Sequence, residues 1–242
     1  MNSPRVQISI LVSLLSLASV SPAEAARHAN SGALAQAQPS GWVNEITNPF
    51  FPLTPGTTFH YEGETDGIPT SNDTAVTHDT KDIVGVTTTV VHDVVYTDGV
   101  LSEDTLDWYA QDSDGNVWYF GEDTKELDSN GNVISTEGSW EAGVNGAEPG
   151  IIMEAHPHPG DKYQQEFAVD VAEDVAQVLN LNRNLCVAYG CFDDLLLTKE
   201  YSLLEKGVTE HKYYAPGVGN ILEGVVKGGD ELSELVSIST GN

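Results

Sequence analysis

The chain has 242 residues and a formal net charge of −27, with 37 Asp and Glu against 10 Lys and Arg. This length is enough for one domain with a substantial core. So negative a charge excludes non-specific binding to nucleic-acid phosphates and argues against anionic membrane surfaces. It favours solubility and makes cation binding worth considering, although a solvated acidic surface accounts for it more simply.

The N-terminus has the features of a signal peptide. Arg5 precedes an apolar run, Ile8–Val20, and Ala23-Glu24-Ala25 fits the small-x-small cleavage pattern. The apolar run is too short to cross a bilayer comfortably, and no cysteine near the cleavage point could carry a lipid anchor. We therefore expect residues 1–25 to be removed and the mature protein to be secreted or periplasmic, without membrane insertion.

Composition separates a spacer from the folded part of the chain. Residues 26–40 are small and polar, which predicts a disordered spacer. Residues 41–242 are predicted to form a single β domain. This domain begins with an extended stretch punctuated by prolines, Asn48–Gly56, which places Phe50 and Phe51 against a core.

Turn signals divide the next part of the domain into antiparallel strands. Aromatic-rich runs flank Asp114-Gly115 in the segment Asp107–Thr124, the strongest hairpin signal in the chain. Asp98-Gly99 and Asn130-Gly131 repeat the signal at intervals of roughly 15 residues, which predicts a meander rather than βαβ units. The strands expected here are Thr57–Gly63, Val76–Val84, Val86–Tyr96, Leu101–Gln111, Asn116–Gly121, Lys125–Asp128 and Asn132–Gly138, with a loop at Gly63–Asp73.

The second half of the domain continues in the same manner. A longer loop is expected at Gly143–Pro159, followed by a strand-like stretch at Tyr163–Val171. Glu173–Leu181 fits either a short helix or a strand, and the hairpin that follows favours a strand. The remaining expected strands are Leu195–Leu204, Glu210–Ala215, Ile221–Lys227 and Leu232–Ser239.

The two cysteines, Cys186 and Cys191, predict a disulfide, because an exported chain matures in an oxidising compartment. The four residues between them suit a short hairpin loop with the cysteines facing each other at its neck. A redox-active pair would have two intervening residues, so a thiol oxidoreductase is not expected.

About ten strands with little helix predict a mainly β fold, in which one antiparallel sheet curls into an open half-barrel. Such a sheet buries one face and leaves an apolar concavity.

Two stretches carry a family resemblance. They are Asp107–Thr124 with its extension through Gly138–Gly143, and Thr209–Gly219, which ends in Tyr-Tyr-Ala-Pro-Gly-Val-Gly. Together they resemble a group of exported bacterial β-proteins. The Tyr-Tyr-Ala-Pro-Gly-Val-Gly ending, preceded by Tyr189-Gly190-x-Phe192 and then Leu195–Glu200, is also similar to TapB-like and Lol-type carrier folds. That resemblance implies an open half-barrel that shelters a lipid or acyl chain. The chain departs from the lipoprotein members of the group because it has no lipidation cysteine.

Aromatic residues crowd into the middle of the chain. Strand alternation sends Trp108 and Tyr109 to opposite faces, while Trp118 and Phe120 share a face opposite Tyr119. One face must belong to the core, and the other is a candidate ligand platform. We predict a ligand-binding set that comprises Trp108, Trp118, Phe120 and Tyr214, with core packing as the alternative explanation.

A cation site is a second candidate. Asp112, Asp114 and Asn116 offer oxygen ligands for calcium, although Gly115 stands at the wrong position for an EF-hand loop. The alternative is a hairpin turn whose side chains satisfy local backbone groups. His156 and His158 could bind a transition metal but have no third ligand of known position.

No catalytic residues are predicted, since the chain has no GxSxG, HExxH, P-loop or GxGxxG motif. The sequence favours a non-enzymatic exported protein that binds a small apolar or amphipathic, lipid-like ligand. The alternative is an extracellular module that binds calcium or is stabilised by it. No cofactor other than calcium is expected, and the sequence does not indicate an oligomeric state.

Overall fold

The computed structural model describes Pro39 and residues 41–241, so the predicted signal peptide and nearly all of the predicted spacer lie outside the described residues. These residues form strands and no helix, and therefore contain no helix that could cross a membrane. The strands are β1 (Trp42–Val43), β2 (Thr57–Thr65), β3 (Ile68–Ile83), β4 (Val86–Thr97), β5 (Val100–Asp112), β6 (Val117–Leu127), β7 (Val133–Ser135), β8 (Trp140–Glu141), β9 (Glu148–Met153), β10 (Lys162–Gln164), β11 (Glu166–Phe167), β12 (Asp174–Val187), β13 (Gly190–Ser202), β14 (Thr209–Ala215), β15 (Gly219–Lys227) and β16 (Glu231–Thr240).

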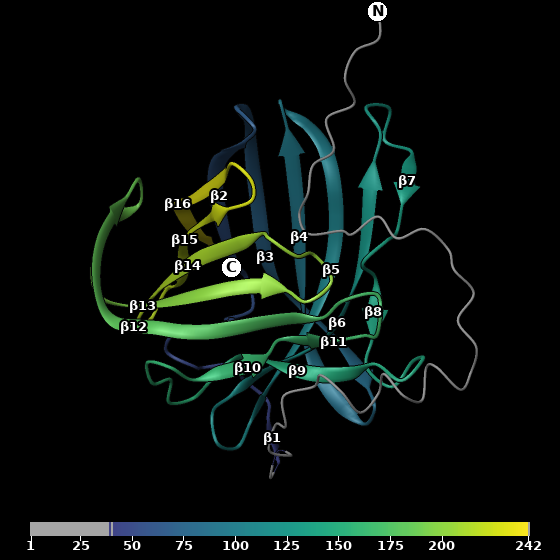
Figure 1. The fold of residues 1–242 in the computed structure, drawn as a ribbon. Helices are drawn as coiled ribbons and strands as arrows, with labels where there is room; N and C mark the ends of the chain where they lie inside the picture. Colours follow the sequence, from purple (N-terminus) through teal and green to yellow (C-terminus); the bar gives the residue numbers. More distant parts are fainter. Residues whose placement is uncertain (1–38, 40, 242) are drawn as a thin grey trace, which may run out of the picture.

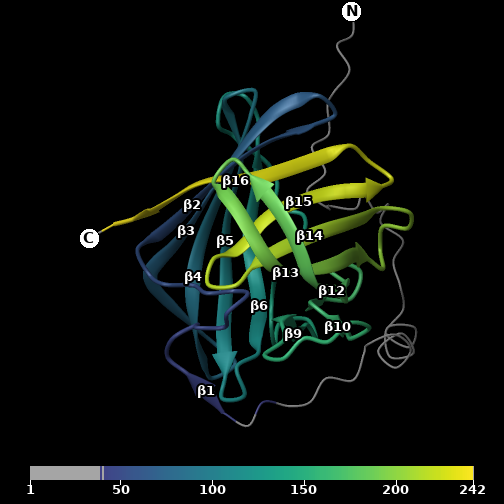
Figure 2. The ribbon, with the colours of Figure 1, turned by 90° about the vertical axis from the view of Figure 1, so that its left-hand side faces the viewer.

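One antiparallel sheet contains all sixteen strands of the described residues, in the main order β10-β12-β13-β14-β15-β16-β2-β3-β4-β5-β6-β9-β11. The two ends of this order, β10 and β11, are consecutive pieces of the segment 162–167. Because β10 pairs with β12 and β11 pairs with β9, this segment joins the two ends of the sheet. The result is a nearly closed barrel, in which β2–β6 form one wall and β12–β16 the other (Figures 1 and 2).

The predicted mainly β fold with one curled antiparallel sheet is confirmed, but the sheet is more closed than an open half-barrel and has more than ten strands. The ambiguous segment Glu173–Leu181 lies mostly in β12, as favoured. The extra strands are short or polar, and such strands give weak periodic signals in a sequence.

The predicted loop at Gly63–Asp73 is wrong. These residues form a hairpin of β2 and β3 around Asp66 and Gly67, which both have positive φ angles, 52° and 74°. The start of β3 is polar because Thr70, Ser71 and Asn72 line a polar interior instead of packing in an apolar core. A rule that equates polar stretches with loops therefore fails here.

The predicted loop at Gly143–Pro159 is also partly wrong, because it contains β9. Gly150 permits the barrel to close at this point. A Cβ atom on Gly150 would lie 2.2 Å from the carbonyl oxygen of Gln165, so any other residue would push β9 away from the closing segment. Glycine within a strand often marks such a close approach of two backbones.

The segment that precedes β2 closes one end of the barrel. The backbone amides of Thr47 and Asn48 both donate to Oε1 of Gln111 at 2.8 Å, and the amide of Gly217 donates to the carbonyl of Pro49 at 2.7 Å. Asn48 is buried, and its Nδ2 donates to the carbonyl of Gly115 at 2.9 Å. These bonds fasten the segment to β5, to the β5–β6 turn and to the β14–β15 turn.

Two apolar clusters stabilise the barrel. The first lies near the closed end and includes Phe59, Met153, Leu196, Ile221 and Leu235. The second packs on β5 and β6 and includes Trp108, Trp118 and Phe120 of the predicted ring set, whereas Tyr214 belongs to the first. Each fully buried Leu, Ile, Phe or Met side chain contributes roughly 1.5–3 kcal/mol.

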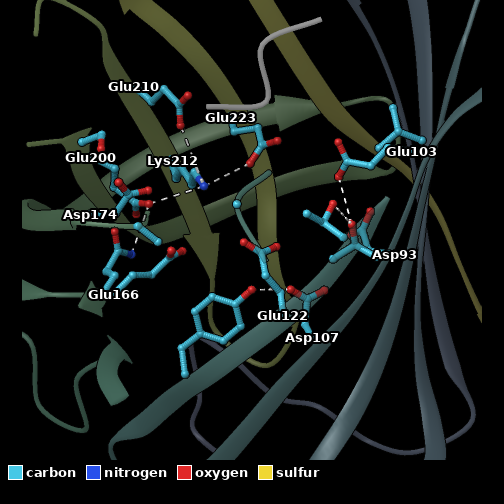
Figure 3. A pocket seen from close by; sticks show the side chains of 18 of the residues that line it. Asp93, Glu103, Asp107, Glu122, Glu166, Asp174, Glu200, Glu210, Lys212 and Glu223 are labelled. Atoms are coloured by element: carbon cyan, nitrogen blue, oxygen red, sulfur yellow. Dashed lines mark hydrogen bonds and ion pairs between the residues drawn. The ribbon is translucent and has the colours of Figure 1, made fainter. Parts of the chain in front are cut away.

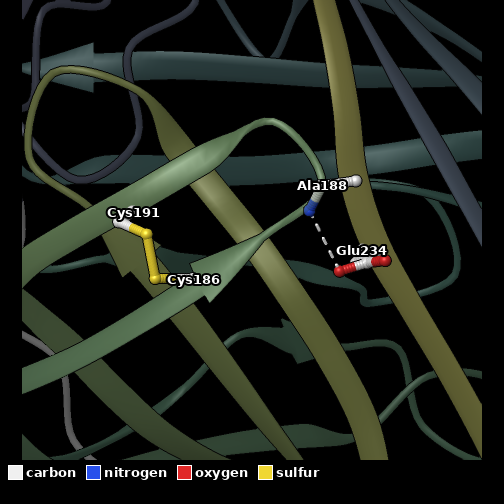
Figure 4. The surroundings of a disulfide bond; sticks show 4 residues. All are labelled: Cys186, Ala188, Cys191 and Glu234. Atoms are coloured by element: carbon white, nitrogen blue, oxygen red, sulfur yellow. Dashed lines mark hydrogen bonds between the residues drawn. A yellow bond between two sulfur atoms is a disulfide. The ribbon is translucent and has the colours of Figure 1, made fainter.

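The predicted disulfide between Cys186 and Cys191 is confirmed, at the neck of the β12–β13 hairpin (Figure 4). At the tip of this hairpin, the amide of Ala188 donates to Oε2 of Glu234 at 3.2 Å and the amide of Tyr189 donates to the carbonyl of Leu235 at 3.0 Å. Since β14 and β15 separate β13 from β16 in the sheet, the hairpin crosses these two strands to reach β16.

Removing the disulfide by the double change Cys186→Ala and Cys191→Ala should lower the free energy of unfolding by about 2 kcal/mol. The effect is modest because the closed loop is short, with a sequence separation of 5. Urea unfolding of the oxidised protein and the double variant measures it. A loss much above this value would show that the hairpin tip unfolds together with the barrel when the bond is absent.

Candidate functional site

The interior of the barrel holds an acidic cavity of about 340 Å³ (Figure 3). Its carboxylate side chains come from both walls and from the closing segment. They are Asp93, Glu103, Asp107, Glu122, Glu166, Asp174, Glu200, Glu205, Glu210, Glu223 and Glu231. Lys212 is the one Lys or Arg among the residues that line this cavity. We refer to this set as the acidic cavity.

Strand alternation and register bring these carboxylates together. Glu103 and Asp107 are four residues apart on β5, so they point to the same face, and Asp107 pairs with Glu122 on β6. On the opposite wall, Lys212 of β14 pairs with Thr198 of β13 and with Glu223 of β15. In each wall, the inward positions that would normally be apolar are thus acidic.

Lys212 is held by three carboxylates. Its Nζ lies 3.4 Å from Glu200, 3.6 Å from Glu223 and 3.9 Å from Glu210. Burial opposes the charge of Lys212, but Glu200, Glu223 and Glu210 outweigh it and raise the pKa of the amine well above its usual value. The structure thus shows how an ammonium group is accommodated inside this barrel.

Glu200 anchors this ion-pair cluster. Its Oε1 accepts hydrogen bonds from the hydroxyls of Thr198 at 2.7 Å and Tyr214 at 3.1 Å, and its Oε2 accepts one from Nε2 of Gln165 at 3.2 Å. The side chain is 7% exposed. A buried carboxylate with this many donors is held in a fixed position.

The carboxylates of the opposite wall have neutral partners or none. Asp93 accepts from Asn72 and from the hydroxyl of Thr74, while Asp107 accepts from the hydroxyl of Tyr119. Glu122 lies deep in the barrel and has no hydrogen-bond or ion-pair partner among the described residues. This half of the cavity therefore concentrates carboxyl groups without a counter-ion from the described residues.

Burial raises the pKa values of the carboxyl groups in this half of the cavity. It raises the pKa of Asp93 to about 6, and, with the charge of Asp93, it raises the pKa of Glu103 to about 7 and of Asp107 to about 8. Burial and neighbouring carboxylates also raise the pKa of Glu122 and Glu166 well above the usual value. Desolvation and like charge are the two physical causes, and both disfavour the ionised form.

A second cavity of about 220 Å³ adjoins the acidic cavity toward the closed end of the barrel. Asn72, Asp93, Tyr109, Ile152, Lys212, Glu223 and Ser233 line both cavities. The remaining lining of the second cavity is mostly apolar or aromatic, and it includes Phe51, Pro52, Leu53, Phe59 and Val218. We call this second space the apolar cavity.

Three of the four rings predicted to bind a ligand line neither cavity. Trp108, Trp118 and Phe120 belong to the second core cluster and are 5%, 3% and 0% exposed. Trp118 and Phe120 do share a face, where both pack edge-on against Trp42. Tyr214 lines the apolar cavity. A binding role for the four rings stays a prediction, but the position of the first three is that of core residues.

Tyr109 and Tyr119 occupy the other face of the same two strands. Their rings stack with centroids 4.7 Å apart, and both line the acidic cavity. The sequence shows that Trp108 and Tyr109, like Trp118 and Tyr119, lie on opposite faces of their strands. It does not show which of the two faces points into the barrel. Alternation along β5 does place Glu103 and Asp107 on the face of Tyr109, and this was the signal that could have found the site. Glu122 was hidden from such a search, because a register shift in β6 between Tyr119 and Glu122 changes the face on which it lies.

The predicted calcium loop is a tightly bonded hairpin turn. The carboxylate of Asp112 accepts from the amides of Asp114 and Asn116, from Nδ2 of Asn116 and from Nε1 of Trp118, all within 3.0 Å. These contacts match the alternative explanation, in which the side chains satisfy local groups. No group of three or more His, Cys, Asp or Glu in the described part of the chain is arranged to hold a metal ion. Calcium binding stays an untested prediction.

No family model and no curated protein matches the sequence. Two crystal structures are similar in fold. One is a "putative exported protein with YmcC-like fold" from Bacteroides fragilis, with 14% identity and a TM-score of 0.47; the other is a "putative lipoprotein" from Parabacteroides distasonis, with 12% identity and a TM-score of 0.36. Each alignment covers 79% of this chain and 99% of the other.

These descriptions belong to those two proteins, and the secreted or periplasmic location predicted for this chain agrees with them. Neither names a TapB-like or Lol-type carrier, so that part of the resemblance stays a prediction.

Proposed function

We propose that this protein is an exported, non-enzymatic binding protein that holds a small amphipathic ligand inside its barrel. The observation that carries the proposal is the junction of the two cavities. An apolar cavity lined by Phe51, Leu53 and Phe59 continues into a cavity lined by charged groups, and Tyr109 borders both. A ligand with one apolar and one polar end matches this arrangement.

Three eight-carbon probes with different head groups test this proposal: octylamine, octanol and octanoate. Isothermal titration calorimetry at about pH 7.5 should show saturable binding of at least one of them. Phe51→Ala should weaken this binding about tenfold or more, because it removes apolar surface from the cavity wall.

Phe192→Ala is the matched control. Phe192 packs against Tyr189 on the β12–β13 hairpin and lines neither cavity, so this variant should bind as the unmodified protein does. If none of the three probes binds, or if Phe51→Ala and Phe192→Ala weaken binding equally, an interior site for the octyl chain is wrong. Calcium titration in the same instrument tests the alternative function, which would give calcium binding without octyl binding.

A further inference from the structure

We propose that the acidic cavity recognises a protonated amine, so that the ligand's polar end is an ammonium or guanidinium group placed against Asp107, Glu122 and Glu166. This inference deepens the proposed function and rests on the same cavity. It concerns Asp107 and Glu122 on the wall opposite Lys212, together with Glu166 of the closing segment; Lys212 is the one Lys or Arg among the described residues that line this cavity.

The first support is the environment of Lys212. An ammonium group already lies inside this barrel, contacted by Glu200, Glu223 and Glu210 at 3.4–3.9 Å. Lys212 extends from one wall and balances the carboxylates beside it. The carboxylates of β4, β5 and β6 form a comparable set on the other wall, but the described residues place no amine among them (Figure 3).

The second support is Glu122. This side chain lines the cavity, is largely shielded from bulk solvent by the barrel, and has no hydrogen-bond or ion-pair partner among the described residues (Figure 3). A carboxylate in such poorly solvated surroundings without a partner is disfavoured unless it takes up a proton or meets a cation. Asp107 and Glu166 stand close enough to raise its pKa further, so the local field favours any positive group that enters.

The size of the acidic cavity favours an organic amine over a bare metal ion. The carboxylates are spread around a cavity of about 340 Å³, and the described residues contain no compact set of three or more acidic, His or Cys side chains that could hold a metal ion. A bare divalent cation needs several oxygens at close quarters. An amine attached to a carbon chain instead fills space and offers several donors to separate carboxylates.

Calorimetry with four probes separates this inference from the proposed function. At about pH 7.5 octylamine should bind at least tenfold more tightly than octanol, and octanoate more weakly still, because only the amine complements the carboxylates. Cadaverine, a diamine without an apolar end, should bind detectably. Octanol binding as tightly as octylamine would overturn the amine preference and leave the apolar site intact. If cadaverine binds while no octyl probe binds, the apolar site is wrong and the amine preference stands.

Glu122→Gln locates the amine. This variant removes one ionisable carboxyl group at nearly constant shape, and it should weaken octylamine binding about tenfold or more while octanol binding stays within twofold. Glu64→Gln is the matched control, since Glu64 lies on β2 with an exposed side chain and the same change in net charge.

A general field effect of the net charge would weaken amine binding equally in Glu122→Gln and Glu64→Gln, and this result would overturn the assignment of the site. An unchanged octylamine affinity in Glu122→Gln would overturn it as well. Circular dichroism melts of both variants confirm that each is folded before the titrations are compared.

Discussion

Raising the pH from about 5.5 to about 8.5 should lower the thermal midpoint of the ligand-free protein by about 5 °C or more. The physical cause is the acidic cavity, where burial raises the pKa of Glu103 to about 7 and of Asp107 to about 8. In the unfolded chain these groups titrate near their ordinary values of about 4.

The direction of this pH effect follows from the numbers of protons that the folded and the unfolded protein bind. Between about pH 4 and pH 8 the folded protein binds more protons at these carboxyls than the unfolded chain does, so the free energy of unfolding falls as the pH rises. The stabilisation is fully present below the unfolded pKa values and is lost as the pH passes through the folded values. Glu210 and Glu231, whose pKa values burial raises to about 7, act in the same direction.

Differential scanning calorimetry across this range measures the effect. High salt is the control, because it screens repulsion among the surface carboxylates of a chain with a net charge of −27 but affects buried groups much less. A midpoint that is flat or rises from about pH 5.5 to about pH 8.5 in high salt would falsify the view that these carboxyls are protonated in the fold.

Lys212→Met should lower the free energy of unfolding by about 3–5 kcal/mol at about pH 8. The change keeps most of the side-chain volume but removes the cation that lies within 4 Å of Glu200, Glu210 and Glu223. The three carboxylates would then repel one another in a poorly solvated space. At about pH 5.5 the loss should be smaller, because carboxyls without their counter-ion can take up protons.

Two further variants make this prediction specific. Lys227→Met removes the same charge from an exposed position at the end of β15 and should change the stability by less than about 1 kcal/mol. Adding Glu200→Gln to Lys212→Met should recover part of the loss, since it removes one of the unpaired charges. Urea unfolding at about pH 5.5 and about pH 8 measures the stability of the unmodified protein, of Lys212→Met, of Lys227→Met and of the double variant. Equal losses in Lys212→Met and Lys227→Met would contradict a role for the internal ion pairs.

Local signals correctly identified much of the strand pattern. The Asp98-Gly99, Asp114-Gly115 and Asn130-Gly131 turns lie where the sequence predicts hairpins, and strands β4, β5 and β14–β16 follow closely the ranges expected for them. These features depend on neighbouring residues, since turn residues favour particular backbone angles and alternation follows from the strand period. The disulfide is also local, because Cys186 and Cys191 face each other across one hairpin.

The candidate site could not be located in this way. Alternation divided Trp108 from Tyr109 and Trp118 from Tyr119, but assigning the inward face requires knowing where the second wall lies. Polar stretches such as the start of β3 were expected to be loops, because a polar barrel interior gives the same signal as solvent.

The sequence by itself determined the strong negative charge, the antiparallel meander, the hairpin turns and the cysteine pair. Only the tertiary structure decided that the sheet nearly closes, that the tyrosine face of β5 and β6 points inward, and that carboxylates from both walls surround Lys212. The physical reason is distance along the chain. Turn and strand preferences act over a few residues, whereas Glu122 and Lys212 are brought to one cavity by the pairing of strands that closes the barrel.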